Sequence, residues 1–138
     1  MSPPARSHPD PVVNLETERY WAAARDGVLL LKRCTDCGRT HWYPRAVCPH
    51  CLSGATEWYQ ASGHGTVYTF SVMRRASPPY VIAYVTLEEG VTMMTQIVDC
   101  DVERLAIGDA VSVTFEATES GHALPVFRPR PPAEGATR

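Results

Sequence analysis

The sequence predicts a mostly β protein with an N-terminal helix, a cysteine-rich ribbon and a five-stranded barrel, in that order along 138 residues. Three observations support this prediction. They are a short amphipathic segment before residue 27, two Cys-x-x-Cys pairs between residues 34 and 51, and a series of segments rich in Val, Thr, Tyr and Phe after residue 63. Hydrophobic residues make up 44% and charged residues 20%, which is ordinary for a folded domain and argues against global disorder.

The N-terminal region is expected to contain one helix. Residues 1–13 include four prolines and little that could be buried, so they are predicted to form a flexible arm. Asn14 is a suitable N-cap and Gly27 a suitable stop, which places a helix and its lead-in over residues 14–30. Val28–Leu31 is expected to be a short strand. The apolar residues of the helix form a modest stripe: Leu15, Trp21 and Ala22.

The two cysteine pairs predict a zinc ribbon over residues 31–60. Cys34 and Cys37 form one Cys-x-x-Cys knuckle, and Cys48 and Cys51 form the second, ten residues later. Two knuckles supply four thiolates, and Zn²⁺ prefers four tetrahedral ligands in structural sites, at about 2.3 Å from each sulfur. Gly38 follows the first knuckle, where the tight turn favours a positive φ. One structural Zn²⁺ is therefore the expected cofactor, with these four cysteines as its ligands.

Other roles for the cysteines are weaker. A redox dithiol needs one such motif in a βαβ context, which is not found here. An iron–sulfur centre also accepts four cysteines. A catalytic zinc needs an open ligand position, and four thiolates leave none. His50 could replace a cysteine, but with four cysteines available it is expected to be a solvated knuckle residue. Cys100 is distant in sequence and is expected to be an unreactive thiol.

A five-stranded barrel of the oligonucleotide/oligosaccharide-binding (OB) type is predicted over residues 61–127, with a β-sandwich as the competing architecture. Turn residues separate the segments, and Asp101 could cap a short helix at Val102–Ile107 between the third and fourth strands. Residues 128–138 are rich in Pro and Ala and are expected to form a flexible tail. The expected strands are Thr66–Arg74, Tyr80–Leu87, Val91–Val98, Val111–Ala117 and Ala123–Phe127.

Charge and hydropathy narrow the classes of function. No apolar run exceeds Val81–Val85, too short for a membrane-spanning helix. The first 14 residues do not resemble a secretory signal, so we expect a reducing, cytoplasmic location, in which cysteines bind metal more often than they form disulfides. The predicted barrel, residues 61–127, carries three arginines against eight acidic residues. A nucleic-acid-binding surface is usually basic, so this charge disfavours such a role.

At this point the chain resembles a known family. These are bacterial and archaeal proteins that join a rubredoxin-like zinc ribbon to an OB-fold, once catalogued as domain of unknown function 35. The resemblance covers about residues 15–127 and includes all four zinc cysteines. The segments that carry it, in order, are Tyr20–Gly27, Leu31–Cys34, Cys37–Gly38, Tyr43–Arg45, Cys48–Cys51, Gly63–Tyr68, Pro79–Ala83, Leu87–Gly90, Ile107–Asp109 and Val111–Phe115.

The resemblance implies an accessory role rather than catalysis. Members of this family resemble partners of thiolase-fold enzymes, namely thiolases, steroid side-chain aldolases, hydroxymethylglutaryl-CoA synthases and acyltransferases. The implied function is a non-catalytic subunit that bridges enzyme subunits in a hetero-oligomer and helps to hold acyl-CoA. The residues themselves show no nucleophile motif and no clear carboxylate pair. The sequence of Gly63–Gly65 fits a strand-entry turn better than a phosphate loop, and His64 is expected to be an exposed histidine.

Two sets of residues are candidates for binding in such a complex. Cationic side chains could contact the phosphates of acyl-CoA, although solvated surface arginines are equally compatible with the sequence: Arg33, Arg45, Arg74 and Arg75. Aromatic side chains could dock on a partner protein, unless the helix folds back and buries them: Tyr20, Trp21, Trp42 and Tyr43. The alternative function is binding of single-stranded nucleic acid, for which Tyr68, Phe70, Tyr80 and Tyr84 would be stacking platforms.

Overall fold

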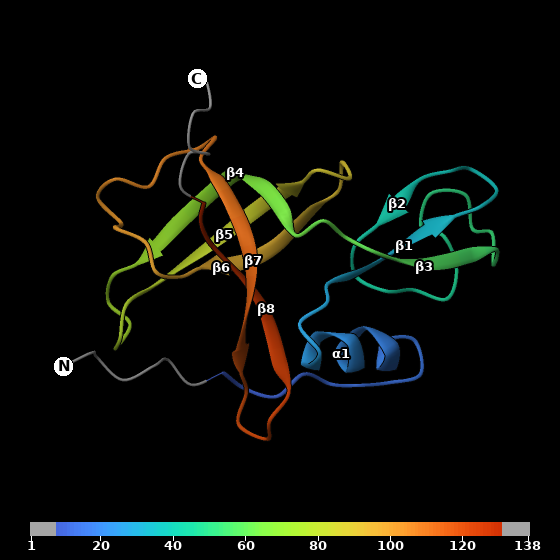
Figure 1. The fold of residues 1–138 in the computed structure, drawn as a ribbon, viewed down its shortest axis with the longest axis horizontal. Helices are drawn as coiled ribbons and strands as arrows, with labels where there is room; N and C mark the ends of the chain where they lie inside the picture. The colour runs from blue at the N-terminus through green and yellow to red at the C-terminus, as the bar shows by residue number, and fades with distance from the viewer. Residues whose placement is uncertain (1–7, 131–138) are drawn as a thin grey trace. The chain divides into compact units, whose positions relative to one another are not determined.

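The computed structural model describes residues 8–130 and confirms a mostly β fold, with one helix, three short ribbon strands and a closed five-stranded barrel over that range (Figure 1). The chain forms two compact units. The ribbon unit comprises the described residues up to Gln60 together with Phe115–Pro125. The barrel unit comprises Ala61–Thr114 and the described residues from Val126 onward. The rest of the predicted arm and tail, residues 1–7 and 131–138, lies outside the described residues.

The helix α1 spans Glu18–Arg25 and begins three residues later than the sequence predicted. The side-chain oxygen of Asn14 accepts hydrogen bonds from the backbone N–H groups of Glu16 and Thr17, at 3.0 and 3.1 Å, and so closes a turn ahead of the helix. Gly27 ends the helix as predicted. It has a φ of +78°, and its N–H donates to the carbonyl of Ala24 at 3.0 Å, as in a Schellman motif.

The predicted apolar stripe of this helix is partly wrong. Leu15 lies in the turn before α1 and is 93% exposed, and Ala22 is also exposed. The buried face of α1 consists of Tyr20, Trp21 and Ala24. Because α1 has only two turns, its two large aromatic side chains supply most of the apolar area that it buries.

The ribbon unit contains a small antiparallel sheet in the order β2-β1-β3. The strands are β1 (Leu30–Cys34), β2 (Thr40–His41) and β3 (Thr56–Gln60). β1 begins two residues after the predicted strand and ends at the first zinc cysteine. Lys32 is central to the sheet, since it pairs with His41 on β2 and with Trp58 on β3.

The barrel unit confirms the predicted barrel and not the sandwich. The five strands close in the order β4-β5-β6-β8-β7, with β7 pairing back to β4 and β8 running parallel to β6. Each strand matches a predicted segment to within two residues at either end. The strands are β4 (His64–Met73), β5 (Tyr80–Leu87), β6 (Thr92–Ile97), β7 (Ala110–Ala117) and β8 (Ala123–Pro129).

Alternating residues of the barrel strands fill its interior, as the period of a strand requires. The fully buried side chains include Val85 and Val111. On β8, which departs from this alternation, the adjacent residues Val126 and Phe127 are both fully buried. Gly65 is necessary for this packing. A Cβ atom at residue 65 would lie 2.7 Å from both the Thr86 carbonyl oxygen and a methyl group of Val85, so strands β4 and β5 could not approach as closely.

The predicted helix at Val102–Ile107 is wrong, because the chain forms only a turn there. Asp101 caps this turn as expected, with its carboxylate accepting from the N–H of Glu103 at 3.0 Å. The turn does not continue because the N–H of Ala106, which would extend a helix, donates instead to the carboxylate of Asp109 at 2.9 Å.

Residues 8–10 of the predicted flexible arm are held against the β7–β8 hairpin within the ribbon unit. His8 is 2% exposed, and its Nε2 lies 2.7 Å from a carboxylate oxygen of Glu116. The carboxylate of Asp10 accepts hydrogen bonds from the Thr118 hydroxyl at 2.7 Å and the Ser120 N–H at 2.9 Å. These hydrogen bonds lower the pKa of Asp10 to about 2. Similarly, Arg128 and Pro129 of the predicted tail belong to β8.

Within residues 8–130, no helix has the length and apolar character needed to span a membrane.

Candidate metal centre

The two cysteine knuckles have matching backbone geometry. In the first, the N–H of Gly38 donates to the Cys34 carbonyl at 2.9 Å, and in the second, the N–H of Leu52 donates to the Cys48 carbonyl at 2.8 Å. Both donors have positive φ, +79° for Gly38 and +66° for Leu52. The sequence indicated this conformation for Gly38 but not for Leu52, because a side chain rarely accepts it; it costs roughly 1–2 kcal/mol.

The four cysteine sulfurs converge on one point. Their Sγ atoms all lie within 4.8 Å of one another, and the knuckles are matched crosswise, with 3.5 Å between Cys34 and Cys51 and 3.7 Å between Cys37 and Cys48. A tetrahedral Zn²⁺ with bonds of about 2.3 Å requires sulfurs about 3.8 Å apart. The sulfur positions therefore fit the predicted ion, and the cysteine ribbon holds one structural Zn²⁺.

Backbone N–H groups prepare Cys34 and Cys48 to bind metal as thiolates. The N–H of Cys37 points at the Sγ of Cys34 at 3.4 Å, and this hydrogen bond lowers the pKa of Cys34 to about 7. The N–H of His50 donates to the Sγ of Cys48 at 3.3 Å in the same way. Four protein ligands complete the tetrahedron, so the zinc has no open position for a substrate or water, and its role is structural.

Polar side chains of the two knuckles contact each other. Arg39 follows the first knuckle and lies 3.3 Å from the Nδ1 of His50, which stands inside the second. His50 is exposed and is absent from the group that could hold a metal, in agreement with its expected role as a solvated residue. Asp36 and Ser53, one from each knuckle, are hydrogen-bonded to each other.

The candidate acyl-CoA arginines divide between the two units and differ in their surroundings. Arg33 forms an ion pair with Glu57 at 2.9 Å and lies over the Tyr59 ring, 4.7 Å from its centroid. Arg74 lies 3.4 Å from Glu103. Arg45 in the ribbon unit and Arg75 after β4 are exposed.

The four candidate docking aromatics form one cluster inside the ribbon unit. The ring of Tyr20 contacts those of Trp21 and Tyr43 edge to face, at centroid distances of 5.0 and 5.6 Å, and Trp42 lies 5.4 Å from Tyr43. The indole of Trp42 donates to the Tyr20 hydroxyl at 3.1 Å. Tyr20 is 2% and Trp21 6% exposed. These two side chains are therefore core residues, the alternative that the sequence left open, and only Trp42 and Tyr43 reach the surface.

Sequence reasoning missed a buried basic pair on neighbouring strands of the ribbon sheet. Lys32, the only lysine, is 8% exposed; its ammonium donates to the Arg45 carbonyl at 3.1 Å and lies 4.8 Å from the centroid of the Trp58 ring. His41, opposite it on β2, is 5% exposed, and neither ring nitrogen makes a hydrogen bond to a described residue. Burial lowers the pKa of both groups. The only signal was that Lys32 stands in a strand among apolar residues.

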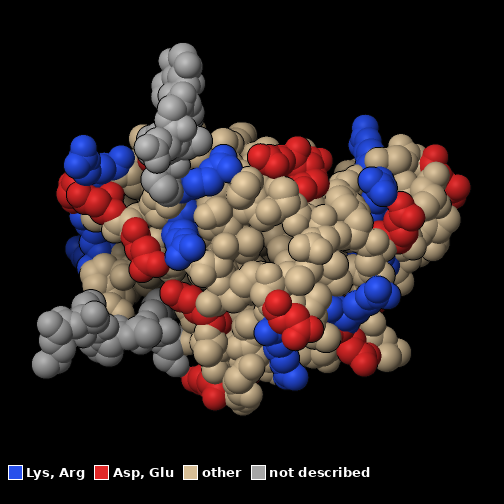
Figure 2. All heavy atoms as spheres, viewed as in Figure 1, with Lys and Arg blue, Asp and Glu red and all other residues tan. Residues whose placement is uncertain are grey.

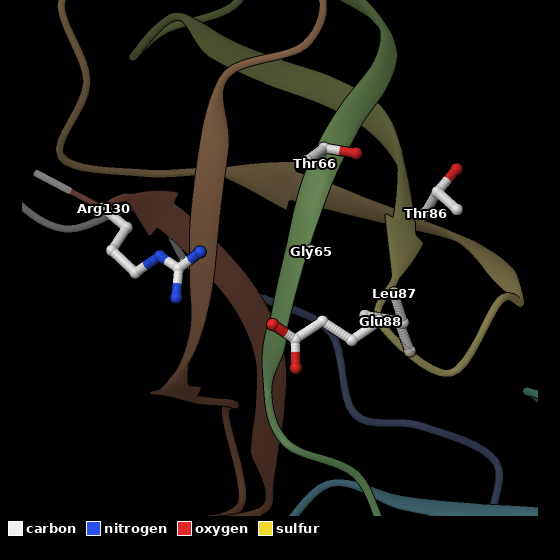
Figure 3. Close-up of a pocket in the computed structure, with 6 residues that line it drawn as sticks. All are labelled: Gly65, Thr66, Thr86, Leu87, Glu88 and Arg130. Carbon is white, nitrogen blue, oxygen red and sulfur yellow. The ribbon is translucent and has the colours of Figure 1, made fainter. Parts of the chain in front are cut away.

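The barrel unit contains a pocket of about 170 Å³, too small for acyl-CoA, since ligand sites usually measure about 300–1,000 Å³. In Figure 3 the side chains of Arg130 and Glu88 extend from opposite sides toward the strand that carries Gly65. His64 lies beside this pocket, 3.7 Å from Glu88, and is 42% exposed at its side chain. Cys100 is half-buried, and burial raises the pKa of its thiol, which suits an unreactive cysteine.

The two parts of the chain match two family models. Residues 21–57 match the rubredoxin-like zinc ribbon domain of ChsH2, and residues 58–116 match the C-terminal OB-fold domain of ChsH2.

Known proteins resemble the whole arrangement. A DUF35 domain-containing scaffold protein of Methanothermobacter thermautotrophicus is 36% identical over 72% of this chain and 81% of its own length. A probable enoyl-CoA hydratase alpha subunit of Thermomonospora curvata is 32% identical over 95% of this chain, which spans 43% of that relative's length. A solved structure named Ltp2-ChsH2(DUF35) aldolase superposes with a TM-score of 0.77 at 31% identity, over 87% of this chain and 98% of that one.

Proposed function

Because this chain belongs to the DUF35 family of zinc-ribbon and OB-fold proteins, we propose that it is a non-catalytic accessory subunit of a thiolase-fold complex that acts on acyl-CoA. In this role it supports assembly of the complex and binding of the acyl-CoA, while the partner supplies the catalytic residues. We place the complex in the reducing cytoplasm, where the zinc thiolates are maintained.

The observation that carries this proposal is the similarity to the DUF35 chain of the Ltp2-ChsH2 aldolase, which extends over 98% of that chain. A likeness over nearly the whole of a chain supports a shared docking role better than a likeness confined to one motif. The names of other relatives, a scaffold protein and a hydratase alpha subunit, are consistent with a subunit that works in an assembly.

The chemistry of the described residues supports an accessory role. The densest set of reactive side chains, the four cysteines, is occupied by a structural metal site. The pocket beside Gly65 in the barrel unit is too small to hold acyl-CoA by itself. We propose that the exposed side chains of Arg45 and Arg75 contact the CoA phosphates. Arg33 and Arg74 are weaker candidates, because each is already paired with a glutamate.

Trp42 and Tyr43 remain candidates for docking in the ribbon unit. Tyr43 is 36% exposed. Its ring packs against the ring of the buried Tyr20, and its hydroxyl accepts a hydrogen bond from the indole of Trp21, while the indole of Trp42 donates to the Tyr20 hydroxyl. The cluster therefore holds both side chains rigidly. Rigid aromatic side chains with one exposed edge are common anchors of protein interfaces.

The alternative function, binding of single-stranded nucleic acid, has less support. Figure 2 shows basic and acidic side chains interspersed over one face rather than a continuous basic band. Residues 61–130 carry five arginines against eight acidic residues, so the barrel is not a track for phosphates.

Co-expression tests the proposed role. The probe is the thiolase-fold protein encoded nearest to this chain in its own genome. We expect the two proteins to elute together in size-exclusion chromatography, and the acyl-CoA activity of the partner to fall when this chain is omitted. This chain alone should turn over no acyl-CoA. Separate elution with unchanged partner activity would contradict the proposal, as would turnover by this chain alone.

A further inference from the structure

One outward face of the barrel, running along β4, β5 and β6 from Thr66, Thr86 and Thr92, carries no charged or histidine side chain of its own. His64 and Glu88, whose side chains lie 3.7 Å apart, border it at that end. The register of β4, β5 and β6 places alternating residues of the three strands on the same side, opposite the buried set. Charged residues are 20% of the chain and normally concentrate at surfaces, so their absence here is unusual. The face, called the uncharged face below, consists of Thr66, Tyr68, Thr69, Ser71, Met73, Tyr80, Ile82, Tyr84, Thr86, Thr92, Met94 and Gln96.

The centre of the uncharged face is apolar and exposed. Tyr84 and Met94 are direct cross-strand neighbours, 44% and 53% exposed, and Tyr84 also neighbours Thr69 on β4. A bulge between Val67 and Thr69 inserts Tyr68, which is 64% exposed. Exposed Tyr and Met without nearby charges are typical of interface centres, which are depleted in charged residues.

We propose that the uncharged face docks on the partner subunit and takes an uncharged protein surface of apolar and hydroxyl side chains. This inference rests on the proposed function and specifies which surface of the barrel makes the contact. Its Thr, Ser and Gln side chains can exchange hydrogen bonds with such a surface, while Tyr68, Tyr84 and Met94 supply the exposed apolar area.

The charge of the face argues against nucleic acid as its occupant. Barrels of this type bind oligonucleotides on their second and third strands, which are β5 and β6 here. That mode pairs aromatic platforms with basic groups. The uncharged face offers tyrosines but no cation of its own. Arg130 lines the pocket at the end of the face where Thr66 and Thr86 lie, but the carboxylate of Glu88 lines the same pocket, so the face is poorly suited to phosphates.

Area and charge also argue against a second copy of this chain. Neighbouring strands are spaced about 4.8 Å apart and each residue adds about 3.4 Å along a strand, so three strands of about eight residues cover roughly 400 Å² or less. A stable interface buries about 800 Å² on each partner. The described residues of the barrel unit carry six acidic residues against five arginines, so a second copy offers no charge complementary to its own. A larger, different partner meets neither obstacle, because it can contact further surface elsewhere on the chain.

A matched pair of charge substitutions tests the proposal. Met94→Glu places a carboxylate in the uncharged face, and Ile107→Glu places one on another exposed apolar residue of the same unit, 67% exposed and outside the face. The binding partner is the thiolase-fold protein used above, and the dissociation constant is measured by titration calorimetry. We expect Met94→Glu to weaken binding about tenfold or more, since an unpaired charge would be desolvated, and Ile107→Glu to bind as the native chain does.

The outcomes separate this proposal from the proposed function. If the native chain binds and Met94→Glu and a second variant, Tyr84→Arg, bind equally well, the face is not the docking surface, while the accessory role stands. If the native chain does not bind, both proposals fail. A native homodimer that Met94→Glu dissociates would identify a second copy as the occupant and would overturn the inference. Unchanged zinc content and far-UV circular dichroism establish that each variant is folded.

Discussion

The ribbon unit and the barrel unit are stabilised in different ways. Between residues 31 and 60 the fully buried apolar side chains are Leu31, Cys34 and Cys48, and two of these three are zinc ligands. The barrel interior instead contains a continuous set of aliphatic and aromatic residues from all five strands, including Val67, Val85, Met93, Val111 and Phe127. Between residues 31 and 60 the metal therefore takes the place of most of a hydrophobic core, and the remaining apolar packing of the ribbon unit comes from the aromatic cluster around Tyr20.

This difference also explains where backbone strain is tolerated. Leu52 adopts a left-handed conformation in the second knuckle because its N–H completes the loop around Cys48. Zinc binding contributes far more free energy than this conformation costs. In the barrel unit, the left-handed conformation beside Val113 is adopted by a glycine, Gly63, with a φ of +84°. A Cβ atom there would lie 2.7 Å from a methyl group of Val113.

Removal of zinc is the largest perturbation that distinguishes the units. We expect Cys48→Ser to lose the metal and to unfold residues 31–60, because the binding free energy of a structural zinc, about 10–16 kcal/mol in small domains, is also folding free energy. The barrel strands should keep their hydrogen bonds. Elemental analysis gives the zinc content, and residue-resolved amide exchange gives the extent of unfolding.

The matched control for this variant is Cys100→Ser, which should retain one zinc per chain because Cys100 lies outside the metal site. Full zinc content in Cys48→Ser would contradict the assigned ligands. Loss of amide protection in the barrel together with the ribbon would show that the units do not unfold independently.

A core substitution should perturb the barrel and leave the metal in place. Phe127→Ala removes a fully buried ring from β8 and should lower the free energy of unfolding by about 3–5 kcal/mol. All three tryptophans, Trp21, Trp42 and Trp58, lie in the ribbon unit, so their fluorescence reports on the ribbon. Urea titrations followed by circular dichroism should show that Phe127→Ala unfolds at a lower urea concentration than the native chain, while its zinc content is unchanged. A change below about 1 kcal/mol would contradict the assigned core position.

A smaller effect is expected from Gly65→Ala. The new methyl group would meet the backbone oxygen of Thr86 at 2.7 Å, and strands β4 and β5 would have to separate, at a cost of about 1–3 kcal/mol. Gly54→Ala is the control in the ribbon unit, where the added Cβ meets nothing within 4 Å. It should leave the urea midpoint unchanged or raise it slightly. Equal effects of the two substitutions would show that β4 and β5 are not so closely paired.

The zinc ligands and the barrel strands could be predicted from the sequence because both are encoded locally. A Cys-x-x-Cys knuckle closes within four residues, and the alternation of Val81–Leu87 defines a strand without reference to the rest of the chain. The start of α1 was predicted too early because the Asn14 side chain closes a separate turn, which has the same sequence signature as an N-cap.

Contacts between distant residues could not be predicted. The hydrogen bond between Asp10 and Ser120 spans 110 residues, and nothing near Asp10 in sequence distinguishes it from a residue in a mobile arm. Burial of Tyr20 and Trp21 likewise depends on Trp42 and Tyr43, 22 residues further along. The pairing of Lys32 with His41 required the register of β1 and β2, which composition does not reveal.

The smallest effect concerns the aromatic cluster, which is the apolar part of the ribbon unit that does not depend on zinc. Tyr20→Phe should lower the free energy of unfolding at pH 7 by about 0.5–1.5 kcal/mol, because the indole N–H of Trp42 loses its acceptor. Burial raises the pKa of Tyr20, so its phenol stays protonated in the folded state while the unfolded chain ionises near pH 10. The folded state then binds more protons than the unfolded state, and stability falls as the pH rises above 10, by up to about 1.4 kcal/mol per pH unit.

The pH dependence of this variant distinguishes a buried phenol from an exposed one. The phenylalanine ring of Tyr20→Phe has no proton to lose, so the deficit of the variant should shrink and then reverse between about pH 10 and 11, as measured by urea titration of tryptophan fluorescence. Trp42→Phe removes the donor but keeps the buried phenol, so its deficit should persist over the same range. A Tyr20→Phe deficit that is constant from about pH 7 to 11 would mean that the Tyr20 hydroxyl is open to solvent and that the cluster is not a core.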